Sequence, residues 1–407
     1  MTDTTTAAQP RRLSQGEFIA LMGVMFATIA FSIDAMLPAL PEIAAELSPE
    51  APNRAQLILT AFVIGMGAGT LVAGPLSDAF GRRRIIFLGA GLYVTGAMLA
   101  YVAPTLELVL AARVLQGLGA AGPRIVSLAM VRDLYAGREM ARIVSFAMLV
   151  FMAFPAIAPL IGAGIIAAFG WRAIFIVFLI FSAISIGWLA HRQPETLALP
   201  DRRPLRPAPL RDAAAEVLRH PQVMLSTLIQ VLILAMLFGT LSSVQPVFDI
   251  AYGRGDSFPL WFGAIAIISA GPPLINAALV MRLGMRPLIR AALGVQVILS
   301  LLALAIFLSP ALPGASSFWI FLIWTASMFA ATSFTLGNLN ALALEPMGHI
   351  AGMASSVMGA ISTLFGAALG AIVGLFFNGT PIPLVAAVSA FAIIAYAIAR
   401  KLPREGR

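Results

Sequence analysis

Apolar stretches of about 20 residues recur along the whole chain and constrain its fold more than any other feature. Each is long enough to cross a hydrocarbon layer of roughly 30 Å as a helix. Lipid offers no partners to backbone N–H and C=O groups, so a crossing segment must be a helix or part of a closed barrel. The stretches lack the alternation of barrel strands. They therefore predict an all-α polytopic membrane protein.

The composition agrees with this prediction. Only 11% of the 407 residues are charged and 60% are hydrophobic, whereas a soluble domain carries roughly 25% charged residues. Most of the surface must therefore face something other than water. We expect twelve spans, at residues 18–40, 53–75, 84–103, 107–131, 141–167, 171–190, 222–246, 258–280, 287–308, 316–341, 351–375 and 381–400.

The longest polar interruption, from His191 to His220, is rich in proline and separates two sets of six spans. A short helix from Leu210 to Leu218 is expected in it, along the membrane surface. Two six-helix halves with a site at the membrane midplane are typical of secondary transporters. We expect a cytoplasmic tail at 1–17, six-helix bundles at 18–190 and 222–400, a cytoplasmic linker at 191–221 and a second cytoplasmic tail at 401–407.

The positive charges predict the orientation, because basic residues stay on the cytoplasmic side. Of the 26 Lys and Arg residues, 21 lie in the tails, the linker and the loops on the side of the N-terminus, and 3 lie in the opposite loops. Both termini should therefore be cytoplasmic. This placement explains the net charge of +8 without a nucleic-acid partner. The chain has no cysteine, which excludes disulfide and thiol chemistry.

Asp34 is the one acidic residue in the interior of a predicted span, where an ionisable group costs at least about 2.5–3.5 kcal/mol. Pro38 has no N–H, so the carbonyl of residue 34 loses its helical partner and the span should kink there. A carboxyl group beside that carbonyl, in a low dielectric, is expected to load and unload a proton near neutrality. We interpret Asp34 as the proton-coupling carboxyl. The alternative is a helix-end carboxylate held by water or a hydroxyl.

Arg113 lies at a depth that matches Asp34, each roughly 10 Å below the same membrane edge. This is compatible with direct or water-mediated coupling between them. Gln116 adds hydrogen-bonding groups at the same level, and the glycines at 117, 119 and 122 should allow close helix approach. The alternative is a structural arginine bonded to neighbouring carbonyls.

Arg124 follows Arg113 by eleven residues, about three turns, and so lies on nearly the same helix face. Two arginines that face a cavity would favour anionic, zwitterionic or neutral substrates over dications. The alternative is that Arg124 extends its side chain towards the inner membrane surface.

The loop after the second span also carries a pattern of glycine and charge. Glycines at both ends indicate a tight turn. Asp78 should cap a neighbouring helix or pair with an arginine, and so hold one face of the bundle shut. The candidate gating residues are Gly74, Asp78, Gly81, Arg82 and Arg83.

These motifs resemble those of the major facilitator superfamily. Residues 74–84 are similar to its loop signature, and the stretch from Arg113 is similar to its span-4 signature, whose arginine is implicated in proton coupling in antiporters. In the fifth span, Ala158 to Ala163 resembles the antiporter signature Gly-Pro-x-x-Gly-Gly. The motif residues of that span are Pro155, Pro159 and Gly162.

Residues 32–41 are similar to the first span of the Bcr/CflA, or bicyclomycin-type, drug-resistance subfamily, and Val131 to Tyr135 also fits it. Met36 stands where tyrosine is usual in that subfamily, and Arg124 lies outside its pattern. The resemblance implies a major facilitator fold in a bacterial cytoplasmic membrane, a monomer, and proton-driven export of drug-like compounds with no cofactor beyond the proton gradient.

The C-terminal half has no ionisable residue in mid-span. Its polar side chains are therefore the candidates for a substrate cavity, together with Met36, Gln116 and Arg124 of the other half. They are Gln230, Gln245, Asn276, Asn338 and Asn340. Five glycines of the span 351–375 are spaced so that several share one packing face, either a sliding interface or a static one.

The leading interpretation is an antiporter that exports a small amphipathic compound in exchange for protons by alternating access. A dedicated metabolite exporter and a proton-coupled uptake symporter are the alternatives within transport. A non-transporting receptor, expected to carry a further soluble domain, is the alternative from another class. No catalytic or metal-binding constellation indicates an enzyme.

Overall fold

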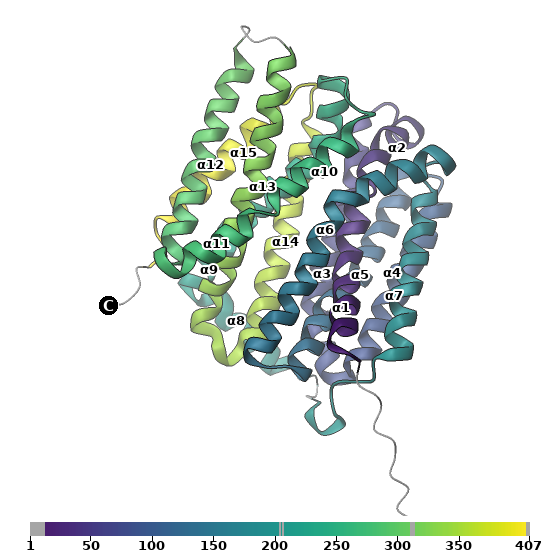
Figure 1. Cartoon of the computed structure of the whole chain (residues 1–407), viewed down its shortest axis with the longest axis vertical. Coiled ribbons are helices and arrows are strands. Elements are labelled where there is room, and N and C mark those ends of the chain that lie inside the picture. Colours follow the sequence, from purple (N-terminus) through teal and green to yellow (C-terminus); the bar gives the residue numbers. More distant parts are fainter. Residues whose placement is uncertain (1–12, 203–204, 206, 310–313, 404–407) are drawn as a thin grey trace, which may run out of the picture.

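The computed structural model describes residues 13–202, 205, 207–309 and 314–403. Within them the chain is helical and contains no strand, as predicted. Figure 1 shows two groups of helices side by side, the N-terminal half in purple to teal and the C-terminal half in green to yellow. Residues 1–12 and 404–407 of the expected tails lie outside the described residues.

The N-terminal half consists of six long helices with short 3₁₀ segments at the breaks. Its elements are α1 (Gln15–Asp34), η1 (Leu37–Ala39), α2 (Leu40–Leu47), η2 (Pro52–Gln56), α3 (Leu57–Phe80), α4 (Arg82–Val102), α5 (Leu106–Leu134), α6 (Gly137–Phe169) and α7 (Ala173–Arg192). The linker contains η3 (Leu199–Asp201) and α8 (Pro207–Arg219), and α8 confirms the short helix expected there.

The C-terminal half repeats this plan with different breaks. Its elements are α9 (Pro221–Pro246), η4 (Val247–Ala251), α10 (Phe258–Ser269), α11 (Pro272–Leu283), α12 (Met285–Leu308), α13 (Gly314–Leu344), η5 (Glu345–Ile350), α14 (Ala351–Leu375) and α15 (Ile382–Ala399).

The number of spans agrees with the prediction. In the described part of the chain, 11 helical segments are long and apolar enough to cross a membrane. The longest, Ser316–Leu375, has 60 residues and contains two helices, α13 and α14, joined by η5. Counted separately, these two helices bring the total to twelve.

Two of the predicted spans are broken inside the bundle. The first helix ends at Asp34, as Pro38 predicts. The break in the eighth span, between Ser269 and Pro272, was not predicted, although Gly271 and two consecutive prolines mark it. Proline removes helical hydrogen bonds and clashes with the preceding turn. Both breaks therefore follow from local sequence.

The predicted close approach around α5 is confirmed, and it involves two neighbours. A Cβ atom at Gly117 would collide with the backbone of Phe62 in α3, and one at Gly119 would collide with Tyr93 in α4. A Cβ at Gly122 would lie 3.1 Å from the carbonyl oxygen of Ile85. Small residues on both sides of α5 allow it to lie tightly between α3 and α4.

The two halves meet along two pairs of helices. On one side α3 packs against α14, where a Cβ at Gly67 would lie 3.0 Å from the Leu364 side chain. On the other side α6 packs against α10, where a Cβ at Gly263 would lie 2.9 Å from the carbonyl oxygen of Ala156. In Figure 1 these four helices lie between the two groups. The continuation of span 8, α11, has no buried residue and packs on α12 and α13 instead.

The glycines of α14 pack against both halves. Cβ atoms at Gly366 and Gly370 would meet Leu234, Gly239 and Phe238 of α9 at 2.6–2.8 Å. The expected packing face is therefore present: these two glycines join α14 to α9, and a Cβ atom at Gly374 would meet Gln56 of the N-terminal half.

The two ends of the bundle differ in how the halves are joined. We call the end with Gly81, Asp133 and Glu195 the linker end, and the opposite end the far end. At the far end, Asn53 donates to the carbonyl oxygens of Leu375 (3.1 Å) and Phe377 (2.7 Å). These hydrogen bonds join the N-terminal half to the C-terminal half.

Candidate functional site

The break at Asp34 leaves a backbone carbonyl without its helical donor. Where α1 ends, the N–H of Met36 donates to Ile33 at 3.2 Å, a tighter turn than the α-helix allows. In a continuous helix that N–H would donate to Ser32. The carbonyl oxygen of Ser32 is therefore released and can accept from another helix.

Arg113 supplies that donor. Its Nη2 donates to the carbonyl oxygen of Ser32 at 2.9 Å, and its Nε donates to the carbonyl oxygen of Ile58 at 3.3 Å. Its Nη1 donates to Oε1 of Gln116 at 2.8 Å, and the guanidinium lies 4.4 Å from the ring centroid of Phe62. The side chain is completely buried. Arg113 thus joins α1, α3 and α5 through hydrogen bonds, the contacts expected of the structural alternative.

Asp34 is 5% exposed. Within the described residues its carboxyl group forms no hydrogen bond and no ion pair, with Arg113 or with any other cation. The two residues expected to couple are instead connected through Ser32, two positions before Asp34. An unpaired carboxylate in such a place is costly, and binding a proton removes its charge.

Gly162 of the fifth-span motif packs directly against this break. A Cβ atom at position 162 would collide with the carbonyl oxygen of Ala35, the residue after Asp34. Pro159 is buried beside it, and Pro155 is partly exposed one turn earlier. The structure therefore brings the motif of α6 and the break in α1 together, which the sequence alone did not establish.

Tyr93 was missed in the sequence analysis. Its hydroxyl lies 2.6 Å from Oγ of Ser32, which also donates to the carbonyl oxygen of Thr28 at 2.6 Å. Tyr93 is buried in the middle of α4. A hydroxyl group in the centre of an apolar span needs a hydrogen-bonding partner. The position of Tyr93 in the middle of its span was therefore the signal in the sequence.

The remaining cavity candidates fall into separate places. Met36 is fully buried, and Gln116 is bound to Arg113. In the C-terminal half, Gln230 donates to Asn340 (3.2 Å) and accepts from Ser362 (3.3 Å).

Two further candidates of that half form bonds elsewhere. Asn338 donates to Asn276 at 2.8 Å and so joins α13 to α11. Gln245 lies 3.5 Å from Asp249, one turn further along the chain. Within the described residues, no group of three His, Asp or Glu side chains could hold a metal ion.

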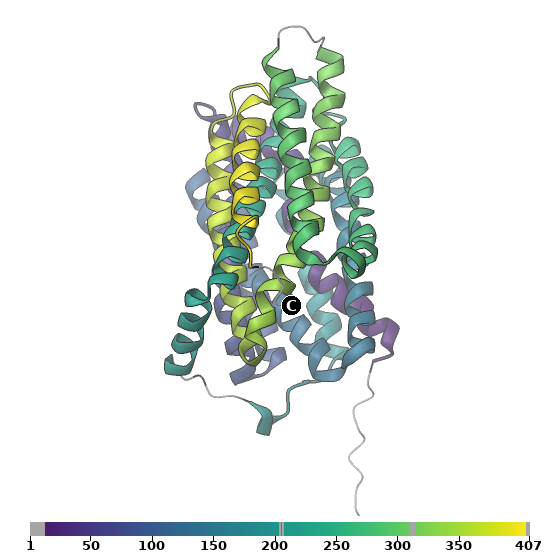
Figure 2. The same ribbon diagram turned by 90° about the vertical axis from the view of Figure 1, so that its left-hand side faces the viewer.

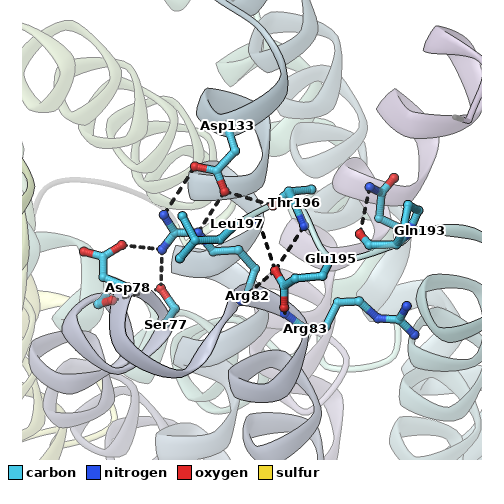
Figure 3. A network of polar contacts seen from close by, with 11 residues as sticks. Ser77, Asp78, Arg82, Arg83, Asp133, Gln193, Glu195, Thr196 and Leu197 are labelled. Carbon is cyan, nitrogen blue, oxygen red and sulfur yellow. Dashed lines mark hydrogen bonds and ion pairs between the residues drawn. The ribbon is translucent and has the colours of Figure 1, made fainter. Parts of the chain in front are cut away.

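Arg82 is the centre of a polar network at the linker end, drawn in Figure 3. It forms an ion pair with Asp78 and donates to Ser77 at 2.8 Å. Its Nε donates to Asp133 of α5 at 2.9 Å. Gly81, with φ of +103°, makes the turn that places Arg82 at the start of α4. The expected pairing of Asp78 with an arginine is confirmed.

These contacts correct one part of the expectation for the loop. Asp78 was expected to hold one face of the bundle shut, but its ion pair, like those of Arg82, is with a residue of the N-terminal half. Gly74 is the loop residue that faces the other half, where a Cβ atom would lie 3.4 Å from Oγ of Ser356 in α14. The network therefore joins α3, α4 and α5 to one another.

Glu195 of the linker completes this network and was also missed. Its carboxylate accepts from the backbone N–H groups of Arg82 (3.0 Å) and Arg83 (3.2 Å), at the N-terminus of α4. Thr196 donates to Asp133 at 2.8 Å, and the Arg83 side chain donates to the carbonyl oxygen of Ala190 at 2.8 Å. Carboxylates stabilise helix N-termini. The sequence does not show that Glu195 lies at the N-terminus of α4, because that position depends on how the linker folds after α7.

Comparison with known proteins identifies the class to which this fold and these motifs belong. Residues 20–374 match the family model described as Major Facilitator Superfamily. The chain belongs to this superfamily of membrane transporters.

The chain is also similar in sequence to individual bacterial proteins. It is 30% identical over 283 residues to a bicyclomycin resistance protein homolog of Haemophilus influenzae, which covers 69% of this chain and 70% of the relative. It is 30% identical over 327 residues to the uncharacterized MFS-type transporter YdgK of Bacillus subtilis, covering 78% and 79%. A chloramphenicol resistance protein of Pseudomonas aeruginosa is 36% identical over 187 residues, covering 46% and 44%. The resemblance to the bicyclomycin-type subfamily is confirmed.

Solved structures show the same fold. A D-xylose-proton symporter aligns with a TM-score of 0.73 at 16% identity, covering 95% of this chain and 98% of the other. The human organic anion transporter MFSD10 aligns with a TM-score of 0.65 at 16% identity, covering 95% and 100%. The chain is thus a multi-pass membrane transporter with the major facilitator fold of two six-helix bundles.

Proposed function

We propose that the protein exports a small drug-like or amphipathic compound in exchange for protons, by alternating access of a central site. The observation that supports this most directly is Asp34. It is a buried carboxyl at a break in α1, without a hydrogen-bonding partner among the described residues. Burying such a carboxyl group costs little free energy when it is protonated and much more when it is ionised.

Arg113 gives the loss of that proton a structural consequence. In the present arrangement its Nη2 is engaged by the carbonyl oxygen of Ser32. A charged Asp34 carboxylate, two residues further along the chain, is a stronger acceptor than a neutral carbonyl. Loss of the proton would therefore draw Arg113 from Ser32 towards Asp34 and loosen the contact between α5 and α1. Proton exchange would thereby be linked to helix movement.

The packing around the break can transmit this movement. Gly162 of α6 touches Ala35, and α6 also packs against α10 of the other half. A change at Asp34 would therefore reach one of the two helix pairs along which the halves meet. Small residues bring the packed helices into close contact, so a shift of one backbone displaces its neighbour.

The proposed function also requires a defined orientation of the bundle in the membrane. The linker end carries most of the basic residues and would face the cytoplasm. The far end, closed by the hydrogen bonds of Asn53, would then face the outside. Gln230, Asn338 and Asn340 of the C-terminal half, with Arg124 of the N-terminal half, would supply substrate contacts. Resistance proteins among the relatives support a drug-like substrate.

The test uses the purified protein in liposomes with an imposed pH gradient. A substrate is first found by expressing the protein in an efflux-deficient bacterium and screening a compound panel for protection. The wild type should then accumulate that substrate against its gradient only when a proton gradient is present. Asp34→Asn should lose this accumulation yet keep exchange of labelled for unlabelled substrate, because the neutral amide resembles the protonated carboxyl.

Accumulation by Asp34→Asn driven by the proton gradient would remove Asp34 from the coupling role. The direction of coupling decides between the transport alternatives. Substrate and proton moving in the same direction would indicate an uptake symporter. Protection against none of the panel compounds, with exchange of a cellular metabolite, would indicate a dedicated metabolite exporter.

A further inference from the structure

Arg124 is an exposed residue on a mostly buried face of α5. The face that α5 turns to the interior of the N-terminal half contains Arg113, Ala120, Ser127 and Val131, and all four are buried. Arg124 lies on the same face and is exposed. It is ten residues from the end of α5 at Leu134, which places it roughly 15 Å from the linker end of that helix. An exposed residue at this depth on an interior face borders an open space within the bundle.

No charged group among the described residues balances the charge of Arg124. Its one polar contact in the described part of the chain is with Sδ of Met66, at 4.0 Å, and a thioether is a weak acceptor. The nearby arginine Arg113 is satisfied by three oxygen acceptors, and Arg82 by two carboxylates. No described carboxylate pairs with Arg124. A guanidinium is always charged, so this group remains available to a ligand.

Neutral amides lie at the same level on the other half. Met66, which touches Arg124, precedes Gly67, where α3 packs against Leu364 of α14. Two residues before Leu364, Ser362 donates to Gln230, which in turn donates to Asn340. Asn340 is exposed. The level of Arg124 in the N-terminal half is therefore the level of the Gln230–Asn340 pair in the C-terminal half.

We propose that Arg124 binds an acidic group of the substrate and that the Gln230–Asn340 pair contacts the same molecule from the opposite half. The substrates would then be small amphipathic compounds that carry a carboxylate or a comparable oxyanion, and cationic compounds would be disfavoured by repulsion. This inference rests on the proposed function for the existence of a transported substrate. It adds the charge of that substrate and the residue that selects it.

The geometry also favours a binding site formed by both halves. Arg113, on the same helix face, is completely buried and donates to two backbone carbonyls and to the Gln116 side chain, so it is not free to serve the substrate. Arg124 can bind an oxyanion without losing any bond to an oxygen. A ligand held by Arg124 and Asn340 would contact both moving parts, as transport by alternating access requires.

A matched series of fluorescent probes tests the charge preference. Dansylglycine is anionic, dansylamide is neutral and dansylcadaverine is cationic, and all three share one apolar ring system. Binding to the purified full-length protein in detergent is followed by dansyl fluorescence. We expect the wild type to bind dansylglycine at least about tenfold more tightly than dansylcadaverine. Arg124→Gln should weaken dansylglycine binding about tenfold or more and change dansylamide binding by less than about twofold.

Three further variants test whether the effect is specific to the charge of Arg124. Arg124→Lys keeps the charge and should retain part of the preference for dansylglycine. Arg211→Gln removes an arginine that is exposed on α8, and it should leave all three affinities unchanged. Asn340→Ala should weaken dansylglycine and dansylamide alike, because an amide contact does not depend on the charge of the probe.

The inference is overturned if Arg124→Gln binds dansylglycine as the wild type does, or if the wild type prefers dansylcadaverine. It is also overturned if dansylglycine shows no binding to the wild type at concentrations up to about 1 mM. Failure of the proposed function looks different. Binding that depends on Arg124, without proton-driven movement of any compound in liposomes, would retain this inference and remove proton-coupled export.

Discussion

The guanidinium of Arg113 donates to the carbonyl oxygen of Ser32 at 2.9 Å, across the contact between α5 and α1. The acceptor is available only because α1 stops being an α-helix two residues later, at Asp34. The break that exposes a carboxyl group thus also creates the site that holds the arginine. Four predictions follow from this arrangement and from the contacts around it.

Arg113→Lys should reduce transport at least about tenfold and lower the thermal stability of the purified protein. A lysine has one charged centre and cannot reach Ser32, Ile58 and Gln116 together, so buried acceptors would lose their partner. Initial transport rates in liposomes and unfolding temperature measure the two effects. Arg84→Lys, at an exposed position, is the control. Wild-type transport by Arg113→Lys would show that a positive charge alone is sufficient.

Gly162→Ala should impair transport strongly, because the added methyl group would collide with the carbonyl oxygen of Ala35 and push α6 away from the break. Gly164→Ala is a matched control two residues away, where a Cβ atom meets nothing within 4 Å. Both variants are compared by transport rate at equal amounts of reconstituted protein. Equal rates for the two would mean that the contact between α6 and Ala35 has no role in transport.

Glu195→Gln should destabilise the linker end by about 1 kcal/mol, the usual scale for loss of a charged group at a helix N-terminus. The amide retains one acceptor oxygen but no charge to offset the helix dipole and the arginines around it. We expect faster proteolysis of the linker and a lower unfolding temperature. Glu50→Gln, at an exposed carboxylate between α2 and η2, should change neither. Unchanged proteolysis of Glu195→Gln would contradict a capping role.

Asn53→Ala should open the far end by removing the two hydrogen bonds to Leu375 and Phe377. Because the chain has no cysteine, spin labels can be placed at two introduced cysteines alone. Leu108→Cys on α5 and Leu308→Cys on α12 provide exposed positions in the two halves. Distances between the labels should shift towards longer values in Asn53→Ala. The same distribution as in the parent protein, or an equal shift in Glu50→Ala, would argue against this latch.

Several parts of the site could be predicted because they depend on local sequence. The break at Asp34 follows from Pro38, and the close packing of α5 follows from Gly117, Gly119 and Gly122. The pairing of Asp78 follows from the arginines beside it. The break of span 8 at Gly271 could have been predicted in the same way, since two prolines follow it.

The partners that come from distant parts of the chain could not be predicted. Glu195 reaches the start of α4 because the linker folds back after α7, and Tyr93 reaches Ser32 because α4 and α1 both pack against α5 and α7. Gly162 meets Ala35 because α6 crosses the break. Nothing in the spacing of these residues shows which helices become neighbours.

The sequence by itself determined the class of fold, the number of spans and the expected orientation, because hydrocarbon thickness and the cost of bare backbone groups leave one solution for long apolar stretches. It also located the ionisable residues inside the membrane. Only the tertiary structure decided that Arg113 is bound to Ser32 and that Asp34 has no partner among the described residues. It also decided that Arg124 is exposed where Arg113 is buried. The physical reason is that side-chain partners and burial depend on how the helices pack, whereas span formation depends on each segment alone.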